Sequence, residues 1–298
     1  MRQTSIRMPM NDTDTSTVCR CNRIFGERTL HPLASVIDLS RAAPQQELSL
    51  DCYAVMVAGR VPGCRNGTLC SCDYADATVL FAPPGHYIEA QGEADCRLLL
   101  FHPDLTSLDS LGMKMPEYTY FGYNKSEALR LSLREKRQVE RCLDYIDEEL
   151  HWGIDRFSRI LLCNKIELLL NYCLRFYARQ FILRHDIISE DIAKVTEKID
   201  IYLRSGRAAA TGLPGAQLVA QWAGHSEAYT SDMLHAETGH TTEEYVQKRR
   251  FEMAKQMLIG TESKVSEIAA TLGFPSTPAF TMLFEKCTGC TPNEYRSH

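Results

Sequence analysis

The stretch SEIAATLGFPSTPAFTMLFEKCTGCTPNEYRSH, residues 266–298, decides how the C-terminal part of this 298-residue chain folds. Apolar residues at helical spacing end at Gly273, which can adopt the left-handed conformation that terminates a helix. Ser276 or Thr277 can cap the next helix, Pro278 is tolerated in its first turn, and Gly289 closes it. The residues of this helix that we expect to face inward, from their helical spacing, are Phe280, Leu283 and Phe284. The stretch therefore predicts a helix-turn-helix arrangement of the kind that enters a DNA groove.

The same pattern occurs earlier in the chain, so the C-terminal part contains an internal repeat. TGHTTEEY at 238–245 matches TGCTPNEY at 288–295, an offset of 50 residues. A repeat of this period indicates two copies of one supersecondary unit. We expect helix-turn-helix units at about 214–239 and 264–289, joined by a helix at 242–258 that is about 25 Å long. Such a pair could enter successive major grooves, roughly 34 Å apart.

Three zones precede this repeat. Residues 1–27 are polar without periodicity, and we predict that they are disordered. Residues 28–115 contain β-branched and aromatic runs separated by turn residues, which favour a small barrel or jelly roll. Residues 116–206 change to helical periodicity. We expect helices in this last zone at three places: 132–151, 155–184 and 189–204. A linker, GRAAATGLPG at 206–215, follows them.

The helix expected at 155–184 is apolar over a wide arc. One stripe includes Phe157, Ile160, Leu161 and Leu168, and a second apolar flank includes Leu162, Ile166 and Leu170. A helix of this kind usually has two packing partners. One partner could be its own barrel, and the other could be the same helix of a second subunit.

The C-terminal residues carry a resemblance to a known family. KVSEIAATLGFPSTPAFTMLFEKCTGCTPNEYR (264–296) and ETGHTTEEYVQKRRFEMAKQML (237–258) resemble the AraC/XylS family of bacterial transcription regulators. The resemblance extends over about 214–296. Three upstream stretches resemble full-length, Bacteroidetes-like members of the same family: HPLASVIDLS (31–40), LLFHPDL (99–105) and IELLLNYCLRFYARQF (166–181).

The resemblance implies an α+β chain of two parts. The first is a cupin-like sensor or dimerisation barrel at 28–115, followed by a helical dimerisation segment at 116–206. The second is an all-α DNA-binding domain at 207–298, with its two helix-turn-helix units joined by a long helix. The resemblance also implies double-stranded DNA as partner, a homodimer, and RNA polymerase as a further partner.

The resemblance places base contacts on the exposed face of the second helix in each unit. The base-facing positions that it implies are Ala228, Ser231 and Asp232 in the first unit and Thr277, Pro278, Thr281 and Met282 in the second. Helix N-termini at Ser226 and Ser276 can bind phosphate, and Lys286 lies farther along the second helix. Asp232 could accept a hydrogen bond from a cytosine amine, and Met282 could touch a thymine methyl group.

The charge of the C-terminal part opposes a simple DNA-binding interpretation. Residues 210–298 contain seven Lys or Arg and ten Asp or Glu, whereas DNA-binding domains are usually basic. We therefore expect weak non-specific affinity, with about 2–4 phosphates neutralised per unit, and a larger contribution from dimerisation. Asp232 and Glu285 are alternatively solvated charges that lower non-specific binding. A third alternative is a domain that has lost autonomous DNA binding.

Two other classes of function compete with a sequence-specific transcription regulator. One is an interaction protein that binds another regulator, which the acidic helices favour. The other is a metal cupin enzyme, which needs two or three histidines and a carboxylate at one place. Residues 28–115 offer His31, His86 and His102, with Glu89 near His86. We expect no enzyme activity, no catalytic or metal-binding residues and no cofactor.

The cysteines and the apolar runs bear on the compartment. Seven of the twelve cysteines precede residue 100, and they include the C-x-C pairs Cys19/Cys21 and Cys70/Cys72. These thiols either pack as small apolar groups or form a metal or redox sensor. The chain shows no secretory signal, and no apolar run approaches ~18 residues. We therefore expect a cytoplasmic protein without a membrane partner, whose effector, if any, the residues do not specify.

Overall fold

The computed structural model describes residues 17–41, 46–59, 74, 76–90 and 95–297. These residues form two compact units. The sheet unit holds the described residues up to Phe121 together with 129–174, and the helical unit holds residues 122–128 and 175–297. None of the helices in the described ranges combines the length and apolar character needed to cross a membrane.

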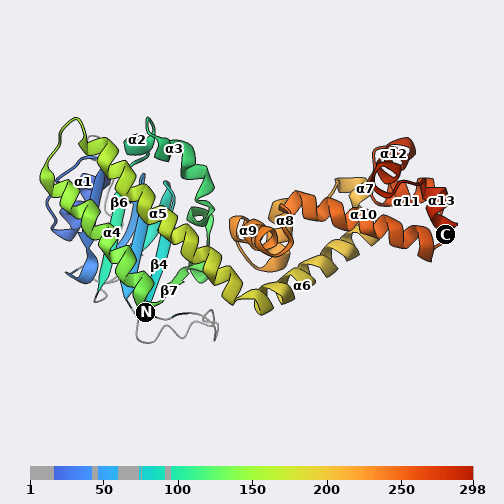
Figure 1. Ribbon diagram of the computed structural model, residues 1–298, viewed down its shortest axis with the longest axis horizontal. Helices are drawn as coiled ribbons and strands as arrows, with labels where there is room; N and C mark the ends of the chain where they lie inside the picture. The colour runs from blue at the N-terminus through green and yellow to red at the C-terminus, as the bar shows by residue number, and fades with distance from the viewer. Residues whose placement is uncertain (1–16, 42–45, 60–73, 75, 91–94, 298) are drawn as a thin grey trace, which may run out of the picture. The chain divides into compact units, whose positions relative to one another are not determined.

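Antiparallel strands form the centre of the sheet unit (Figure 1). The five-stranded sheet has the order β1 (Ala34–Asp38), β6 (Cys96–Phe101), β3 (Tyr53–Gly59), β4 (Ala77–Ala82) and β7 (Leu129–Leu131). A second sheet pairs β2 (Gln46–Leu50) with β5 (His86–Ala90). Val55 of β3 stands between Leu99 of β6 and Phe81 of β4. Val55 and Leu99 are fully buried. The expectation of an N-terminal part built on a sheet is confirmed.

A helix lies within the stretch that we predicted to be disordered. α1 (Thr17–Phe25) packs against β1 and buries Val18 and Cys21 completely. The Thr17 hydroxyl also donates to an Asp51 carboxylate oxygen at 3.2 Å. The prediction is wrong for residues 17–25, because this helix is stabilised by burial against the sheet and not by its own composition. Residues 1–16 lie outside the described residues.

Two long helices, α4 (Leu133–Trp152) and α5 (Ser158–Leu183), cross the same side of the sheet in Figure 1. Ser132 caps α4, and its backbone N–H donates to Glu135 Oε2 at 2.9 Å. α5 begins three residues later than expected, because Asp155 Oδ1 accepts from the backbone N–H groups of Phe157 and Ser158 at 2.8 Å. The shorter elements are α2 (Pro103–Thr106), α3 (Ser110–Lys114) and the 3₁₀ turns η1 (Leu39–Arg41), η2 (Met115–Glu117), η3 (Thr119–Gly122) and η4 (Lys125–Glu127).

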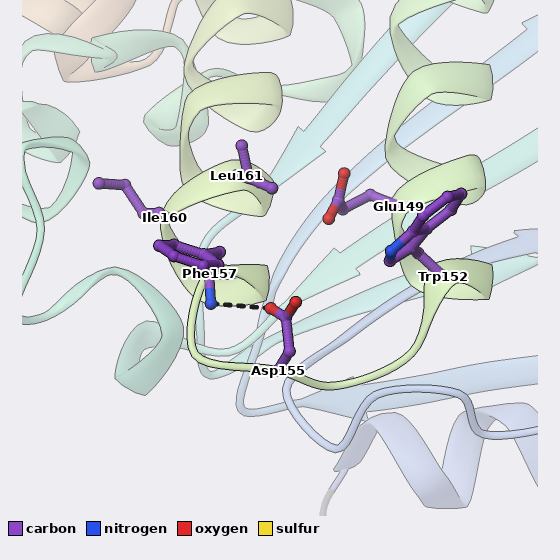
Figure 2. Close-up of a pocket in the computed structure, with 6 residues that line it drawn as sticks. All are labelled: Glu149, Trp152, Asp155, Phe157, Ile160 and Leu161. Atoms are coloured by element: carbon purple, nitrogen blue, oxygen red, sulfur yellow. Dashed lines mark hydrogen bonds between the residues drawn. The ribbon is translucent and has the colours of Figure 1, made fainter.

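The two apolar faces of α5 have different surroundings. Leu162, Ile166 and Leu170, on the second flank of the sequence pattern, are buried. The first stripe is largely exposed: Phe157, Ile160, Leu161 and Leu168 are between 42% and 50% exposed. Figure 2 shows the start of this stripe beside the end of α4, where Glu149, Trp152, Asp155, Phe157, Ile160 and Leu161 line a shallow groove.

The described part of the helical unit consists of helices with short turns. Its elements, besides η4 and the end of α5, are α6 (His185–Arg204), α7 (Arg207–Thr211), α8 (Ala216–Ala223), α9 (Glu227–Thr238), α10 (Thr242–Gly260), α11 (Val265–Thr271), α12 (Thr277–Thr288) and α13 (Pro292–Arg296). α8 and α9 lie at one end of α10, and α11 to α13 lie at its other end (Figure 1). α6 packs against both α8 and α10. We call α8–α9 the first repeat and α11–α12 the second repeat.

The expected linker at 206–215 is partly helical, since residues 207–211 form α7. Ala208 of α7 is buried and packs against Gly273 after α11. A Cβ atom on Gly273 would lie 2.4 Å from the Ala208 carbonyl oxygen, and the φ of Gly273 is +72°. Gly273 is therefore required both by its backbone conformation and by the close approach of α7.

The cores of the two repeats follow the sequence pattern with one exception. In the first repeat Val219, Met233 and Leu234 are buried, and in the second Phe280 and Phe284 are buried. Leu283, which we predicted to face inward, is 41% exposed. This prediction is wrong because Phe280 and Phe284, four residues apart, direct the buried stripe of α12 and leave Leu283 on its flank.

Candidate nucleic-acid interface

Equivalent caps define α9 and α12. Ser226 Oγ accepts from the Tyr229 N–H, and Ser276 Oγ accepts from the Ala279 N–H, each at 3.2 Å. Both helices end at a glycine in the left-handed region, Gly239 and Gly289. Residues 50 apart in the sequence therefore occupy the same position on the two helices.

The outer surface of α12 is open. Pro278 and Met282 are exposed, with Met282 at 72%, and Lys286 is exposed near the end of the helix. Thr281 is half-buried, and its hydroxyl donates to the half-buried Thr277 carbonyl oxygen at 3.0 Å. The structure thus brings these predicted DNA-contacting residues together along one helix. Ser276, which caps the N-terminus of this helix, is also exposed.

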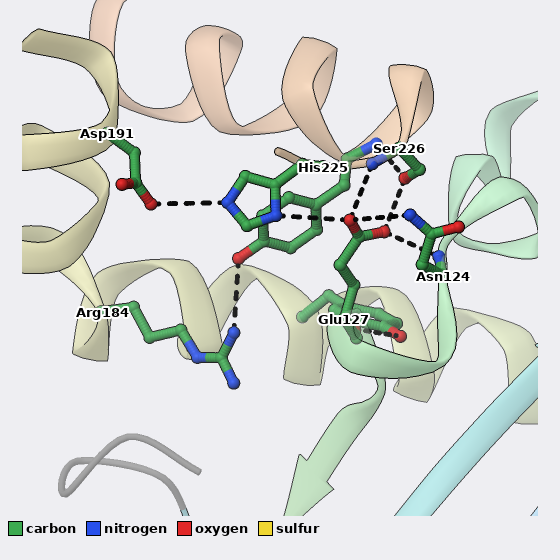
Figure 3. A network of polar contacts seen from close by, with 8 residues as sticks. Asn124, Glu127, Arg184, Asp191, His225 and Ser226 are labelled. Carbon is green, nitrogen blue, oxygen red and sulfur yellow. Dashed lines mark hydrogen bonds and ion pairs between the residues drawn. The ribbon is translucent and has the colours of Figure 1, made fainter. Parts of the chain in front are cut away.

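The N-terminus of α9 is bonded to a carboxylate from a distant part of the chain. Ser226 donates twice to Glu127, from Oγ to Oε2 at 2.6 Å and from its backbone N–H to Oε1 at 2.7 Å (Figure 3). The Glu127 side chain is only 2% exposed. The backbone N–H of Asn124 also donates to Glu127 Oε2, at 2.7 Å. The cap that we predicted to meet a phosphate therefore already holds an anionic group.

His225 extends this network. Its Nδ1 lies 3.3 Å from Glu127 Oε1, and its Nε2 lies 3.4 Å from Asp191 Oδ2 on α6. The hydrogen bond to Glu127, against the opposing effect of burial, raises the pKa of His225. Burial acts to raise the pKa of Glu127, but the hydrogen bonds from His225 and Ser226 outweigh it and the pKa is lowered. The network thus favours a charged imidazolium beside a charged carboxylate.

The side of α9 is covered by the same segment. The Tyr123 hydroxyl donates to Asp232 Oδ2 at 2.6 Å, and the Tyr123 ring packs edge-on against Tyr229, 5.1 Å between centroids. A Cβ atom on Gly122 would lie 3.2 Å from the Ala228 Cβ. Ala228 and Asp232, two of the predicted base-facing residues, are therefore in contact with residues 122–123. Ser231 is half-buried.

Sequence reasoning missed Tyr123, Glu127 and His225 as site residues. Glu127 and Ser226 are 99 residues apart, and Tyr123 and Asp232 are 109 residues apart. No periodicity or motif signals such a contact in a single sequence. The one local hint was the acidic residue Asp232 on a predicted reading helix, which needs a partner other than phosphate.

Most cations of the C-terminal part have intramolecular roles. Arg249 binds Asp200 at 2.6 Å, and Lys255 binds Glu252 at 3.1 Å. Arg250 is buried, and its Nε donates to the Leu272 carbonyl oxygen at 2.8 Å. Burial lowers the Arg250 pKa to about 10. Arg296 donates to the carbonyl oxygens of Leu258 and Ser263. The remaining Lys and Arg after residue 210 are Lys248, Lys264 and Lys286.

Two of the three histidines that were considered for a metal site accept hydrogen bonds from the backbone. His31 Nδ1 accepts from the Leu33 N–H, and His102 Nδ1 accepts from the Asp104 N–H, each at 3.1 Å. His86 is exposed. Across the ranges that the structure describes, no group of three or more His, Cys, Asp or Glu side chains is arranged to hold a metal ion.

Two buried cysteines of the sheet unit, Cys21 and Cys52, behave as apolar groups. Burial raises the pKa of Cys21 to about 11 and that of Cys52 to about 12. Thiols with such pKa values are protonated at neutral pH and react slowly. Cys70 and Cys72 lie outside the described residues, so both alternatives for this pair, apolar packing or a metal or redox sensor, stay predictions.

Comparison with known proteins agrees with the geometry of the helical unit. A profile described as a helix-turn-helix domain matches residues 219–298. The chain is 31% identical over 110 residues to the regulatory protein SoxS of Escherichia coli (strain K12). The matched region covers 37% of this chain and 92% of SoxS. It is 43% identical over 70 residues to the uncharacterized transcriptional regulatory protein YesN of Bacillus subtilis (strain 168). That match covers 23% of this chain and 19% of YesN.

A further relative combines regulation with catalysis. The chain is 41% identical over 58 residues to the bifunctional transcriptional activator/DNA repair enzyme AdaA of Bacillus subtilis (strain 168). This match covers 20% of the chain and 28% of AdaA. The chain thus spans less than a third of YesN and of AdaA but nearly all of SoxS.

The paired helix-turn-helix units define a class of protein that binds DNA in order to regulate transcription. The chain belongs to the AraC/XylS family of transcription regulators.

Proposed function

We propose that this protein is a cytoplasmic, sequence-specific transcription regulator that binds double-stranded DNA as a homodimer and contacts RNA polymerase. Its DNA-binding domain is residues 207–298. Residues 28–115 form a cupin-like sensor or dimerisation domain, followed by the helical segment 116–206. The protein has no enzyme activity in this proposal, and it needs no metal or cofactor.

One observation carries the proposal: α9 and α12 are capped alike, end alike and stand at opposite ends of α10. The 19 residues of α10 span about 28 Å, close to the roughly 34 Å that separates successive major grooves. α9 and α12 are therefore spaced to enter successive major grooves on one face of a DNA duplex. Both helices begin at a serine cap, a position where a hydroxyl and backbone N–H groups can meet phosphate. In this structure Ser226 is bonded to Glu127, whereas Ser276 is exposed.

Base recognition is assigned to the outer faces of these helices. On α12 it involves Thr277, Pro278, Thr281 and Met282, and on α9 it involves Ala228, Ser231 and Asp232. Methyl and thioether groups favour contact with thymine methyl groups, whereas a carboxylate favours the cytosine amine. Ser226, Ser276 and Lys286 supply phosphate contacts. Since few cations remain unengaged, we expect about 2–4 phosphates neutralised per repeat and a shallow salt dependence.

The exposed apolar groove of α4 and α5 supports the homodimer. Trp152 is 84% exposed and Phe157 is 50% exposed, although both side chains are large and apolar. Exposed apolar patches of this kind mark association surfaces in soluble proteins. A second copy would bury these side chains and would join two DNA-binding domains, whose affinities multiply through effective concentration. Sedimentation velocity of the wild-type protein and the Trp152→Ser, Phe157→Ser double variant tests this part.

Selection of binding sites from random duplex DNA tests the proposal as a whole. The full-length protein is used across a salt series, with a Ser276→Ala, Met282→Ala double variant in parallel. We expect an enriched motif with two half-sites, each near two helical turns long, and loss of one half-site element in the variant. A soluble dimer that enriches no motif would refute the proposal, and a stable complex with another regulator would then favour an interaction protein.

A further inference from the structure

We infer that residues 122–128 inhibit the first repeat from within the chain, by occupying the DNA-facing surface of α9 until they are released. The inference rests on the proposed function, because it assigns a mode of regulation to one of the reading helices. The segment contacts Ser226, Ala228 and Asp232, three of the positions that were assigned to DNA. The equivalent residues of α12 are exposed: Ser276, Pro278 and Met282.

The carboxylate of Glu127 takes the place of a phosphate. A phosphate at the N-terminus of α9 would accept hydrogen bonds from the cap hydroxyl and from free backbone N–H groups. Glu127 already accepts from the Ser226 hydroxyl at 2.6 Å and from the Ser226 N–H at 2.7 Å. Two anions cannot use the same donors, so DNA at this helix end must displace Glu127.

Tyr123 occupies the base-facing side of the helix. Its hydroxyl donates to Asp232 Oδ2 at 2.6 Å, which uses the carboxylate that would accept from a cytosine amine. Its ring lies edge-on between Tyr177 and Tyr229, with centroids 5.1 Å from each. Insertion of α9 into a major groove therefore requires Tyr123 to leave Asp232.

The segment is an ordered part of the helical unit. The Glu127 carbonyl oxygen accepts from the Tyr177 hydroxyl, and the Ala128 carbonyl oxygen accepts from Gln180 Nε2, each at 3.3 Å. These bonds join the segment to the last turns of α5. The contact with α9 is thus made from a defined support, and its release is a discrete event.

A release experiment removes the negative charge and one acceptor oxygen at Glu127 and the hydroxyl of Tyr123, while keeping the shape of both side chains. The full-length double variant Glu127→Gln, Tyr123→Phe is compared with the wild-type protein by footprinting and titration on the selected DNA. We expect affinity to rise about tenfold, because the fraction of protein with a free α9 increases. Protection of the DNA that α9 contacts should increase relative to protection of the DNA that α12 contacts. Ser126→Ala, an exposed position on the same segment, is the matched control and should change neither.

A locking experiment works in the opposite direction. Gly122→Cys with Ala228→Cys, introduced into the released Glu127→Gln, Tyr123→Phe protein, places two thiols on Cβ atoms 3.2 Å apart. A disulfide, with Cβ atoms about 3.5–4.5 Å apart, then forms after a small shift of the segment. Oxidised glutathione accepts the two electrons as the bond forms, and mass spectrometry confirms the cross-link. We expect the oxidised protein to lose protection of the α9 element and to regain it on reduction with dithiothreitol. The oxidised and reduced forms of one variant control for any effect of the substitutions themselves.

The outcomes separate the inference from the proposed function. Wild-type protein that already protects both elements as strongly as the Glu127→Gln, Tyr123→Phe variant would overturn the inference and leave the proposed function intact. If the wild-type, released and reduced proteins all stay folded by circular dichroism yet enrich no motif, the inference and the proposed function are both refuted. If the cross-linked protein retains full protection of the α9 element, the inference is wrong, because a closed segment would then be compatible with DNA.

Discussion

The two repeats of the helical unit have the same local design and different accessibility. Ser226 and Ser276 cap equivalent helices, but Ser226 is bonded to a buried carboxylate whereas Ser276 is exposed. The cores also differ, because Thr230 occupies the position of Phe280. The Thr230 hydroxyl is buried, and no described group forms a hydrogen bond with it. Duplication therefore preserved the helix geometry, while packing and access diverged.

The largest effect that would sharpen this comparison is expected at the turn glycines. Gly273→Ala should destabilise the helical unit by about 3 kcal/mol, because a left-handed alanine costs roughly 1–2 kcal/mol and the clash with Ala208 adds to it. Gly224→Ala should cost only the first part, since no atom lies within 4 Å of its added Cβ. Urea unfolding of both variants measures the difference. Equal losses would show that α7 does not hold the second repeat.

A smaller, stabilising effect is expected in the core of the first repeat. Thr230→Val should raise the free energy of unfolding by about 1 kcal/mol, because it removes a buried hydroxyl without a hydrogen bond and keeps the side-chain shape. Thr238→Val on the same helix is the control, since the Thr238 hydroxyl donates to the Leu234 carbonyl oxygen at 2.7 Å. Thermal unfolding compares them. A destabilised Thr230→Val protein would contradict the reading of this site.

A comparable effect on DNA binding is expected from the open helix. Met282→Ala should weaken binding to the selected DNA about fivefold, which corresponds to about 1 kcal/mol. Ile259→Ala serves as the control, because Ile259 is 69% exposed near the end of α10 and has no assigned DNA contact. Fluorescence anisotropy titrations give both affinities. Unchanged binding by the Met282 variant would contradict the proposal that α12 contacts DNA bases through Met282.

The smallest expected effect is the pH dependence of the closed contact around His225. The groups that face this ring are Glu127, Asp191 and Tyr229, and Arg184 binds the Tyr229 hydroxyl. Because the His225 pKa is raised, its contribution is fully present below pH 6.5 and is lost as pH rises through the raised value. Because the Glu127 pKa is lowered, its contribution is fully present above pH 4.5 and is lost on acidification through the lowered value.

NMR titration of the His225 ring measures this contribution directly. We expect a pKa above 6.5 in the wild-type protein and a lower one in Glu127→Gln. Footprinting should show more α9 protection as pH rises through the raised His225 pKa, with α12 protection as the internal reference. A His225 pKa that stays the same after the Glu127 substitution would show that Glu127 does not stabilise the charged imidazolium.

Sequence reasoning identified the features that depend on local chemistry. The serine caps, the turn glycines and the apolar spacing of α9 and α12 can each be read within a few residues, so the helix-turn-helix arrangement was predictable. The helix at 17–25 and the α7 helix were not, because each is stabilised by packing on residues far away in the chain. Glu127 and Tyr123 lie in a stretch without periodicity, so only the folded chain shows their contacts with α9.

The covalent continuity of residues 122–128 with α9 has a kinetic and genetic consequence. An inhibitor that is part of the chain competes at a fixed effective concentration, which neither dilution nor higher expression alters. The occupancy of α9 is then a property of each molecule and not of the cell's protein level. A mutation in either partner of the Glu127–Ser226 contact would act only on its own copy, so released and inhibited subunits could coexist within the homodimer that we propose.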